Sequence, residues 1–157
     1  MRASQIRPRF VDFIPDRLEE GVLYISERYR TCSHLCCCGC GEEVVTPLSP
    51  AEWSVRREGD TVSLWPSVGN WDYRCRSHYV IRRNKVLWAG QMTGRQIERV
   101  RARDAADLAR LTATTNARQD RERTRKQGAL LREQLHGARQ TSVFAWLKAW
   151  LVRLWNG

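Results

Sequence analysis

Hydrophobic and polar residues alternate over the first 91 residues in short runs of the kind that form β-strands. The runs cover residues 10–14, 22–26, 44–46, 53–55, 62–65, 79–81 and 86–88. Most are bounded by proline, glycine, asparagine or aspartate, which favour turns. Short strands this close together predict a small, mostly antiparallel β domain, arranged as a meander or a barrel.

The pattern becomes helical after Gly90. Thr93 and Gln96 have the spacing of a capping box, which marks the start of a helix. A helical stripe of apolar residues follows, made of Ile97, Val100, Leu108 and Leu111. Apolar residues then almost vanish over 112–128, which indicates a solvated helix or a flexible linker. The fold class predicted is therefore α+β, with a β domain at 1–91, an Arg-rich helical extension at 92–140 and a separate helix at 141–157.

The last predicted helix is amphipathic and rich in tryptophan. Its apolar face contains Phe144, Leu147, Leu151 and Leu154, widened by Trp146, Trp150 and Trp155. The helix is shorter than the roughly 20 residues that cross a bilayer. We expect it to dock onto the β domain or onto a second copy. Binding in a groove of a conjugation protein and interfacial membrane contact through residues 143–155 are the alternatives.

Charge is distributed unevenly along this basic chain. The net charge is +10, yet residues 1–91 hold 13 basic and 11 acidic residues, while residues 92–157 hold 14 and 6. The excess therefore belongs to the extension. Aromatic residues are absent between Met92 and Gln140, which argues against stacking on single-stranded nucleic acid and predicts no sequence-specific nucleic-acid binding. No secretory signal or membrane-spanning run is visible, so we expect a cytoplasmic protein with reduced thiols.

A dense cysteine cluster gives the strongest chemical signal. Residues 34–41 read HLCCCGCG, and Cys75 begins a C-x-x-H pattern on a separate segment. Zinc prefers four thiolate or imidazole ligands arranged as a tetrahedron. Alternate residues of a straight strand lie nearly ~7 Å apart, so the chain must turn back, and the two glycines permit such a turn. The preferred ligands for Zn²⁺ are Cys36, Cys38, Cys40 and Cys75.

Several alternatives at this cluster stay open. Cys37 has ordinary spacing to Cys40 and could replace one of the first two ligands, and either histidine, His34 or His78, could contribute an imidazole. An iron–sulfur cluster is a further alternative for four cysteines. Cys32 is expected to take part in packing only.

A hydrolytic site next to the metal is a second hypothesis. If a strand begins at Cys75, alternation places Ser77 on the face of the metal loop, where His34 could act as its base. His78 then lies on the opposite face and is a poorer partner. Asn70 could donate a hydrogen bond to an oxyanion. The alternatives are that Ser77 only hydrogen-bonds a cysteine sulfur, or that Ser67 or a metal-bound water is the nucleophile.

Residues 10–88 resemble a bacterial family of domains of unknown function. The resemblance rests on residues 10–15 (FVDFIP), 21–26 (GVLYIS), 34–41, 45–48 (VTPL), 63–71 (SLWPSVGNW) and 75–79 (CRSHY). The family pattern has proline at the position of Cys37. That departure argues against Cys37 as a ligand, and the resemblance does not extend to the Arg-rich and Trp-rich segments.

Members of this family are encoded beside E1-like, E2-like and ubiquitin-like proteins in ubiquitination-like (Bub) operons. The resemblance implies a zinc-binding peptidase of the serine type that processes or removes a bacterial ubiquitin-like protein. E1-like and E2-like proteins are further expected partners. A non-catalytic zinc adaptor that docks a conjugation protein is the alternative, followed by a nucleic-acid-binding protein that uses the Arg-rich stretch.

Overall fold

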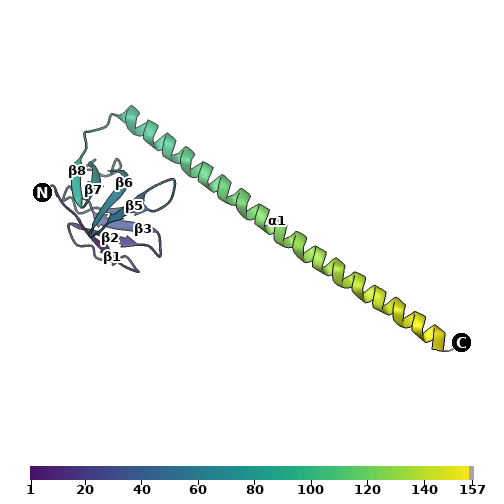
Figure 1. Cartoon of the computed structure of the whole chain (residues 1–157). Helices are drawn as coiled ribbons and strands as arrows, with labels where there is room; N and C mark the ends of the chain where they lie inside the picture. Colours follow the sequence, from purple (N-terminus) through teal and green to yellow (C-terminus); the bar gives the residue numbers. More distant parts are fainter. Residues whose placement is uncertain (156–157) are drawn as a thin grey trace. The chain divides into compact units, whose positions relative to one another are not determined.

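The computed structural model describes the backbone of residues 1–155 and the side chains of residues 1–132. It contains eight strands followed by one long helix (Figure 1). The strands are β1 (Arg7–Phe10), β2 (Val22–Ser26), β3 (Thr31–Leu35), β4 (Glu43–Pro47), β5 (Ser54–Glu58), β6 (Thr61–Gly69), β7 (His78–Arg82) and β8 (Lys85–Trp88). The helix is α1 (Gly94–Trp155).

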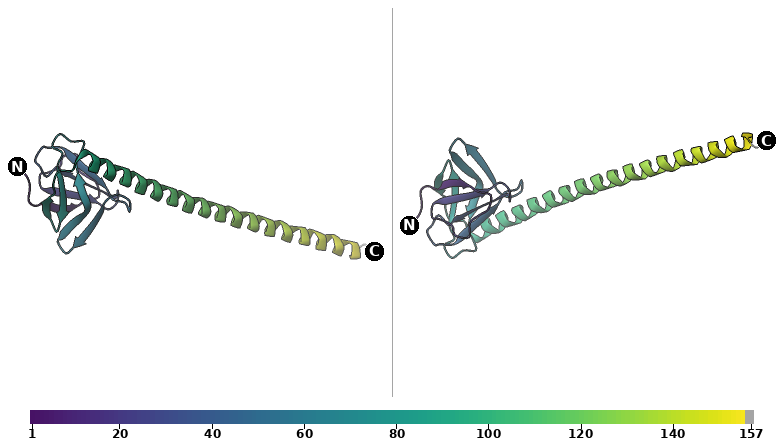
Figure 2. Two further views of the ribbon diagram at one scale, coloured as in Figure 1. Left: turned by 90° about the horizontal axis from the view of Figure 1, so that it is seen from above. Right: turned by 90° about the horizontal axis from the view of Figure 1, so that it is seen from below.

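The strands form two four-stranded sheets, in the orders β1-β2-β3-β4 and β5-β6-β7-β8. Figure 2 shows the strands from two further sides. All neighbours pair antiparallel except β1 and β2, which run parallel. The α+β class with a mostly antiparallel β part is therefore confirmed. Strand β3 was not predicted, because Thr31–Leu35 is mostly polar and lacks the alternation of a strand, although its central residues are buried.

The two sheets share one hydrophobic core. Side chains of β2 and β3 pack in the same buried cluster as side chains of β6, β7 and β8. Its central members are Leu23, Ile25, Val62, Leu64, Tyr79 and Ile81. The removal of this apolar surface from water, at about 25 cal/mol per Å², is the main force that holds the sheets together.

The helical region differs from the expectation of separate helices, because α1 is continuous. The segment contains no proline, and its composition of Arg, Ala, Gln, Leu and Glu has high helix propensity. The predicted capping box is confirmed: the main-chain N–H of Thr93 donates to Gln96 Oε1 at 2.8 Å and that of Gln96 to Thr93 Oγ1 at 3.4 Å. Ile97 is buried, so the first turns of the helix are anchored.

The chain divides into two compact units, Met1–Leu111 and Thr112–Gly157. The three segments expected from the sequence, 1–91, 92–140 and 141–157, stay a prediction. The docking and membrane roles expected for residues 143–155 concern side chains outside the described part of the chain. Among the residues that the structure describes, no helix is both long enough and apolar enough to cross a membrane.

Candidate functional site

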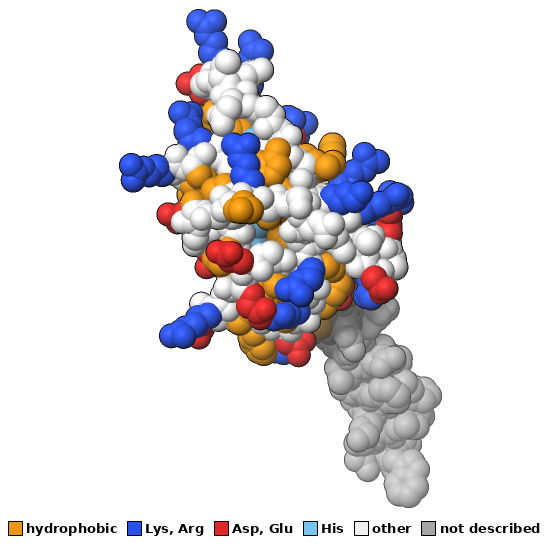
Figure 3. All heavy atoms as spheres, turned by 90° about the vertical axis from the view of Figure 1, so that its left-hand side faces the viewer, with side chains coloured by type: hydrophobic (Ala, Val, Ile, Leu, Met, Phe, Trp, Pro, Cys, Tyr) orange, Lys and Arg blue, Asp and Glu red, His pale blue; other side chains and the backbone are white. Residues whose placement is uncertain are grey.

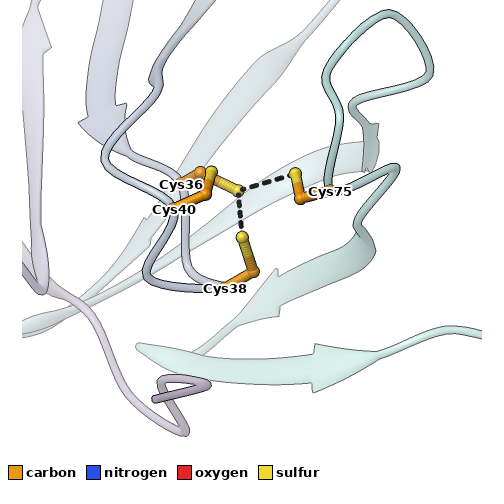
Figure 4. A group of neighbouring side chains, drawn as sticks. All are labelled: Cys36, Cys38, Cys40 and Cys75. Carbon is orange, nitrogen blue, oxygen red and sulfur yellow. Dashed lines mark hydrogen bonds between the residues drawn. The ribbon is translucent and has the colours of Figure 1, made fainter.

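The fold brings together the four cysteines that the sequence indicated as metal ligands. Cys36, Cys38 and Cys40 belong to the loop after β3, and Cys75 belongs to the loop between β6 and β7 (Figure 4). Their four sulfur atoms lie within 4.8 Å of one another. Cys36 Sγ is 3.4 Å from Cys38 Sγ and 3.9 Å from Cys75 Sγ. Sulfurs bound to one zinc ion at ~2.3 Å would be about 3.8 Å apart, so the four residues fit a tetrahedral metal site.

The cysteine loop turns where its glycines allow it. Gly39 and Gly41 have φ of 80° and 84°, in the left-handed region that glycine adopts without strain. The Gly39 N–H donates to Cys36 O at 3.0 Å, and the Cys36 N–H donates to Glu42 O at 2.8 Å. These turns bring three sulfurs of one loop to the same point, as the sequence predicted.

The other two cysteines point into the hydrophobic core and lie outside this group. Cys32 and Cys37 are both buried. Burial raises the pKa of the Cys32 thiol to about 12 and that of the Cys37 thiol to about 11. Cys75 differs, because its pKa is lowered to about 7: burial acts against the thiolate, but hydrogen bonds from Ser77 and from the neighbouring thiols outweigh it. Within the cluster the thiolate is therefore favoured at Cys75, whereas burial raises the pKa of Cys38 and Cys40.

Ser77 and Asn70 lie against the sulfur atoms. Ser77 Oγ is 3.1 Å from Cys36 Sγ and accepts a hydrogen bond of 2.8 Å from Asn70 Nδ2. Asn70 Nδ2 also lies 3.4 Å from Cys36 Sγ. The Ser77 hydroxyl is thus free to donate to Cys36. Hydrogen bonds of this kind orient metal ligands and adjust their charge.

The sequence predicted that His34 would pair with Ser77, but the structure places His34 elsewhere. Its imidazole is completely buried, and its Nε2 lies 2.8 Å from the Tyr79 hydroxyl. Since β3 ends at Leu35, the strand alternation that would align His34 with the cysteine loop stops there. Burial lowers the pKa of His34 to about 4, so the ring is neutral at physiological pH.

The burial of His34 predicts a pH-dependent stability. Its ordinary pKa is 6.5 and its folded pKa is about 4, so the unfolded chain binds more protons between these values and stability falls as pH falls. The contribution lost from about pH 7 to about pH 5 is about 2 kcal/mol. His34→Gln, which cannot titrate there, is expected to lose correspondingly less free energy of unfolding over this interval, as measured by urea denaturation. An unchanged pH dependence in the variant would contradict this account.

A second group of side chains lies on the opposite face of the β6–β7 ladder. His78 Nε2 is 3.0 Å from Ser67 Oγ, and His78 Nδ1 is 3.0 Å from the carbonyl oxygen of Gly90. A carbonyl oxygen can only accept a hydrogen bond, so the ring proton is on Nδ1 and Nε2 accepts the Ser67 hydroxyl. This is the arrangement of a nucleophile with its general base.

The strand register explains why these two residues meet. Gly69 pairs with His78, and Val68 pairs with Tyr79. Because side chains alternate along a strand, Val68 and Tyr79 point into the core while Ser67 shares the outer face with His78. The register of β6 shifts between Leu64 and Val68. A β-bulge of this kind redirects side chains, and it brings Ser67 diagonally within reach of His78.

Trp71 covers this pair from one side. Its ring centroid lies 4.9 Å from that of His78. A Cβ atom on Gly69 would come within 2.3 Å of the Trp71 ring, so glycine is required there for the indole to lie across the strand. The following residue, Asp72, forms a 2.7 Å ion pair with Arg101 of α1. Because both side chains of this pair are exposed, it links the loop to the first turns of the helix only weakly.

The sequence pattern favoured Ser77 as nucleophile with His34 as its base, whereas in the structure the histidine that contacts a serine is His78, which contacts Ser67. Ser77 is the serine that lies on the same face of the strand as the cysteine cluster. The sequence did indicate that His78 lies away from the cluster, since the alternation that puts Ser77 beside Cys75 puts His78 on the other face. The pairing of Gly69 with His78 that brings Ser67 there depends on a bulge that the sequence pattern does not reveal.

Comparison with protein families identifies a matching family model. The model of the family described as "bacterial ubiquitination-like system serine protease (BubE)" matches residues 10–89, which cover the cysteine cluster and the Ser67–His78 pair. No curated protein and no solved structure matches significantly. Since the matched segment is about half of the chain and contains both groups of residues, the chain belongs to the BubE family of bacterial ubiquitination-like system serine proteases.

Proposed function

We propose that this chain is a serine peptidase that cleaves a bacterial ubiquitin-like protein, with Ser67 as nucleophile and His78 as general base. The observation that carries the proposal is the hydrogen-bonded series from Ser67 Oγ through His78 to the carbonyl of Gly90, with both distances at 3.0 Å. The family description supports a serine protease of a ubiquitination-like system. E1-like and E2-like proteins are further partners in this proposal, and the reduced thiols fit action in the cytoplasm.

The geometry supports a two-step hydrolysis. His78 Nε2 takes the hydroxyl proton as Ser67 Oγ bonds to the carbonyl carbon of the substrate peptide bond. The resulting imidazolium is stabilised by the Gly90 carbonyl, which accepts from Nδ1. His78 then gives its proton to the leaving amine as the C–N bond breaks. A water molecule, deprotonated by the same nitrogen, attacks the acyl-serine ester and returns free Ser67 with a carboxylate product.

We assign a structural role to the cysteine cluster, with zinc as its metal. Four thiolates close the coordination sphere of zinc, which is the pattern of structural sites. Cys36, Cys38, Cys40 and Cys75 would hold the ion, which when bound joins the loop after β3 to the loop before β7. Cys75 is three residues from His78, so this link fixes the strand that carries the base. Ser77 and Asn70, expected from sequence as nucleophile and oxyanion donor, belong to this centre in the proposal, because they contact Cys36.

Covalent labelling tests the assignment of the nucleophile. A fluorophosphonate bonds to an activated serine without any need for the natural substrate. We expect the full-length protein to be labelled at Ser67, as located by peptide mass spectrometry, and His78→Gln to be labelled far more slowly because the base is lost. Ser77→Ala is the matched control and should be labelled normally. Labelling at Ser77 in the wild-type protein would overturn the proposal.

A further inference from the structure

Strand β6 extends beyond its neighbour β5 at the end that carries Ser67. The β5–β6 pairing ends with Ser54 opposite Trp65, while β6 continues to Gly69. On the other side, β7 pairs with this extension through Val68 and Gly69. The last residues of β6 therefore have a strand on one side only.

Alternate residues of this extension direct their main-chain N–H and C=O groups to the open side. The N–H of Asn70 donates to Ser77 O at 2.9 Å, across the β6–β7 ladder. Because main-chain groups of successive residues alternate in direction, Val68 also faces β7, whereas Ser67 and Gly69 face away from it. The N–H and C=O of Gly69 thus lie along an edge that β5 does not cover.

Neighbouring segments of the protein leave that edge unpaired. The chain before β5 turns toward β4, because the Trp53 N–H donates to Pro47 O at 3.2 Å and Trp53 O accepts from Ser49 at 3.1 Å. No Cα atom of β4 lies within 8 Å of one in β6. Within the described part of the chain, the main chain of Gly69 forms no hydrogen bond with a segment on this side. Ser67 and Gly69 are both half-buried, so the edge is accessible from solvent.

We propose that the substrate binds as an extended strand along this edge, in line with β5, and pairs with the main chain of Gly69. This inference rests on the proposed function and specifies the substrate as an unfolded peptide segment, such as a tail or linker. An open strand edge recognises extended peptide main chain through a ladder of hydrogen bonds. A strand placed there passes Ser67, whose hydroxyl lies on the outer face two residues from Gly69. The hydrogen bonds of the ladder would therefore determine which peptide bond of the substrate lies at Ser67.

Trp65 is the side chain best placed to read the sequence of such a strand. It is 69% exposed and is the last residue of β6 that pairs with β5, two residues before Ser67. Figure 3 shows hydrophobic side chains exposed among basic ones on one face of the protein. An apolar residue of the added strand would pack on the indole, because cross-strand neighbours interact through their side chains. Trp65→Ala is therefore expected to raise KM, with Leu87→Ala, another exposed apolar residue of the same sheet, as its control.

The test uses peptides in which single main-chain N–H groups are removed. A diverse library of internally quenched peptides first gives the best-cleaved sequence for the full-length protein. A series of that peptide then carries one N-methyl group at each residue in turn. Strand addition predicts losses in kcat/KM of about 10-fold or more at alternate residues near the cleaved bond, and small effects at those between, because only alternate N–H groups face β6.

The outcomes separate this inference from the proposed function. Fluorophosphonate labelling of Ser67 in the same preparation reports the nucleophile alone. If Ser67 is labelled but no library peptide is cleaved, or if N-methylation acts without a two-residue period, strand addition is wrong and the nucleophile assignment stands. If Ser67 is not labelled, the proposed function fails and strand addition falls with it.

Discussion

Ser67→Ala is expected to abolish peptide cleavage, with a fall in kcat of about 10⁴-fold or more. The substitution removes the oxygen that bonds to the substrate carbonyl, while the strand that carries it and the metal cluster on the opposite face stay intact. His78→Ala should be nearly as damaging, because the hydroxyl is a poor nucleophile without a base at 3.0 Å. The measurement is the rate of cleavage of a quenched peptide or a ubiquitin-like protein fusion.

The control for this prediction is the serine on the other face of the ladder. Ser77→Ala removes a hydroxyl that contacts Cys36 Sγ, so it should retain most of the activity. The double variant Ser67→Ala/His78→Ala should be little worse than Ser67→Ala alone, because a nucleophile and its base fail together. Additive losses, or a Ser77→Ala variant as inactive as Ser67→Ala, would show that Ser67 and His78 do not act as a pair.

Loss of a cluster cysteine is expected to cause the largest loss of stability. Cys75→Ser should release the metal and unfold the loops on both sides of it, because a bound ion would join four sulfurs that come from two separate loops. Metal binding at structural zinc sites contributes about 10–16 kcal/mol in small zinc-dependent domains. Metal content by mass spectrometry and the thermal unfolding of the full-length protein are the two measurements. We expect about one zinc ion per wild-type chain and, in Cys38→Ser and Cys40→Ser, the same loss as in Cys75→Ser.

The two buried cysteines outside the cluster provide matched controls. Cys37→Ala and Cys32→Ala should retain the metal and lose only the packing energy of a small side chain. Cys37→Ala is the sharper control, because Cys37 lies between two cluster residues in sequence and yet points into the core. Full metal content in Cys75→Ser, or loss of metal in Cys37→Ala, would overturn the assignment of the four ligands.

Features that depend on short stretches of sequence were predictable. The alternation of residues 10–88 predicted β structure, and the capping box at Thr93 and Gln96 predicted where the helix begins. The four cysteines were also predictable as a group. Two glycines beside three of them permit one specific turn, and Cys75 was the remaining cysteine on a separate segment. In each case the interactions responsible act mainly between residues that are close together in the sequence.

The tertiary structure alone decided how the histidines are used. His34 and His78 each lie near a cysteine in sequence, and strand alternation favoured His34 as the base for Ser77. Packing buries His34 under Tyr79, where it is neutral, whereas the pairing of β6 with β7 places His78 beside Ser67 and the carbonyl of Gly90. That pairing depends on a register shift in β6, and the shift is determined by how β6 and β7 pack together. Short-range pattern determines which face of a strand a side chain occupies, but only the pairing of distant strands determines what it meets there.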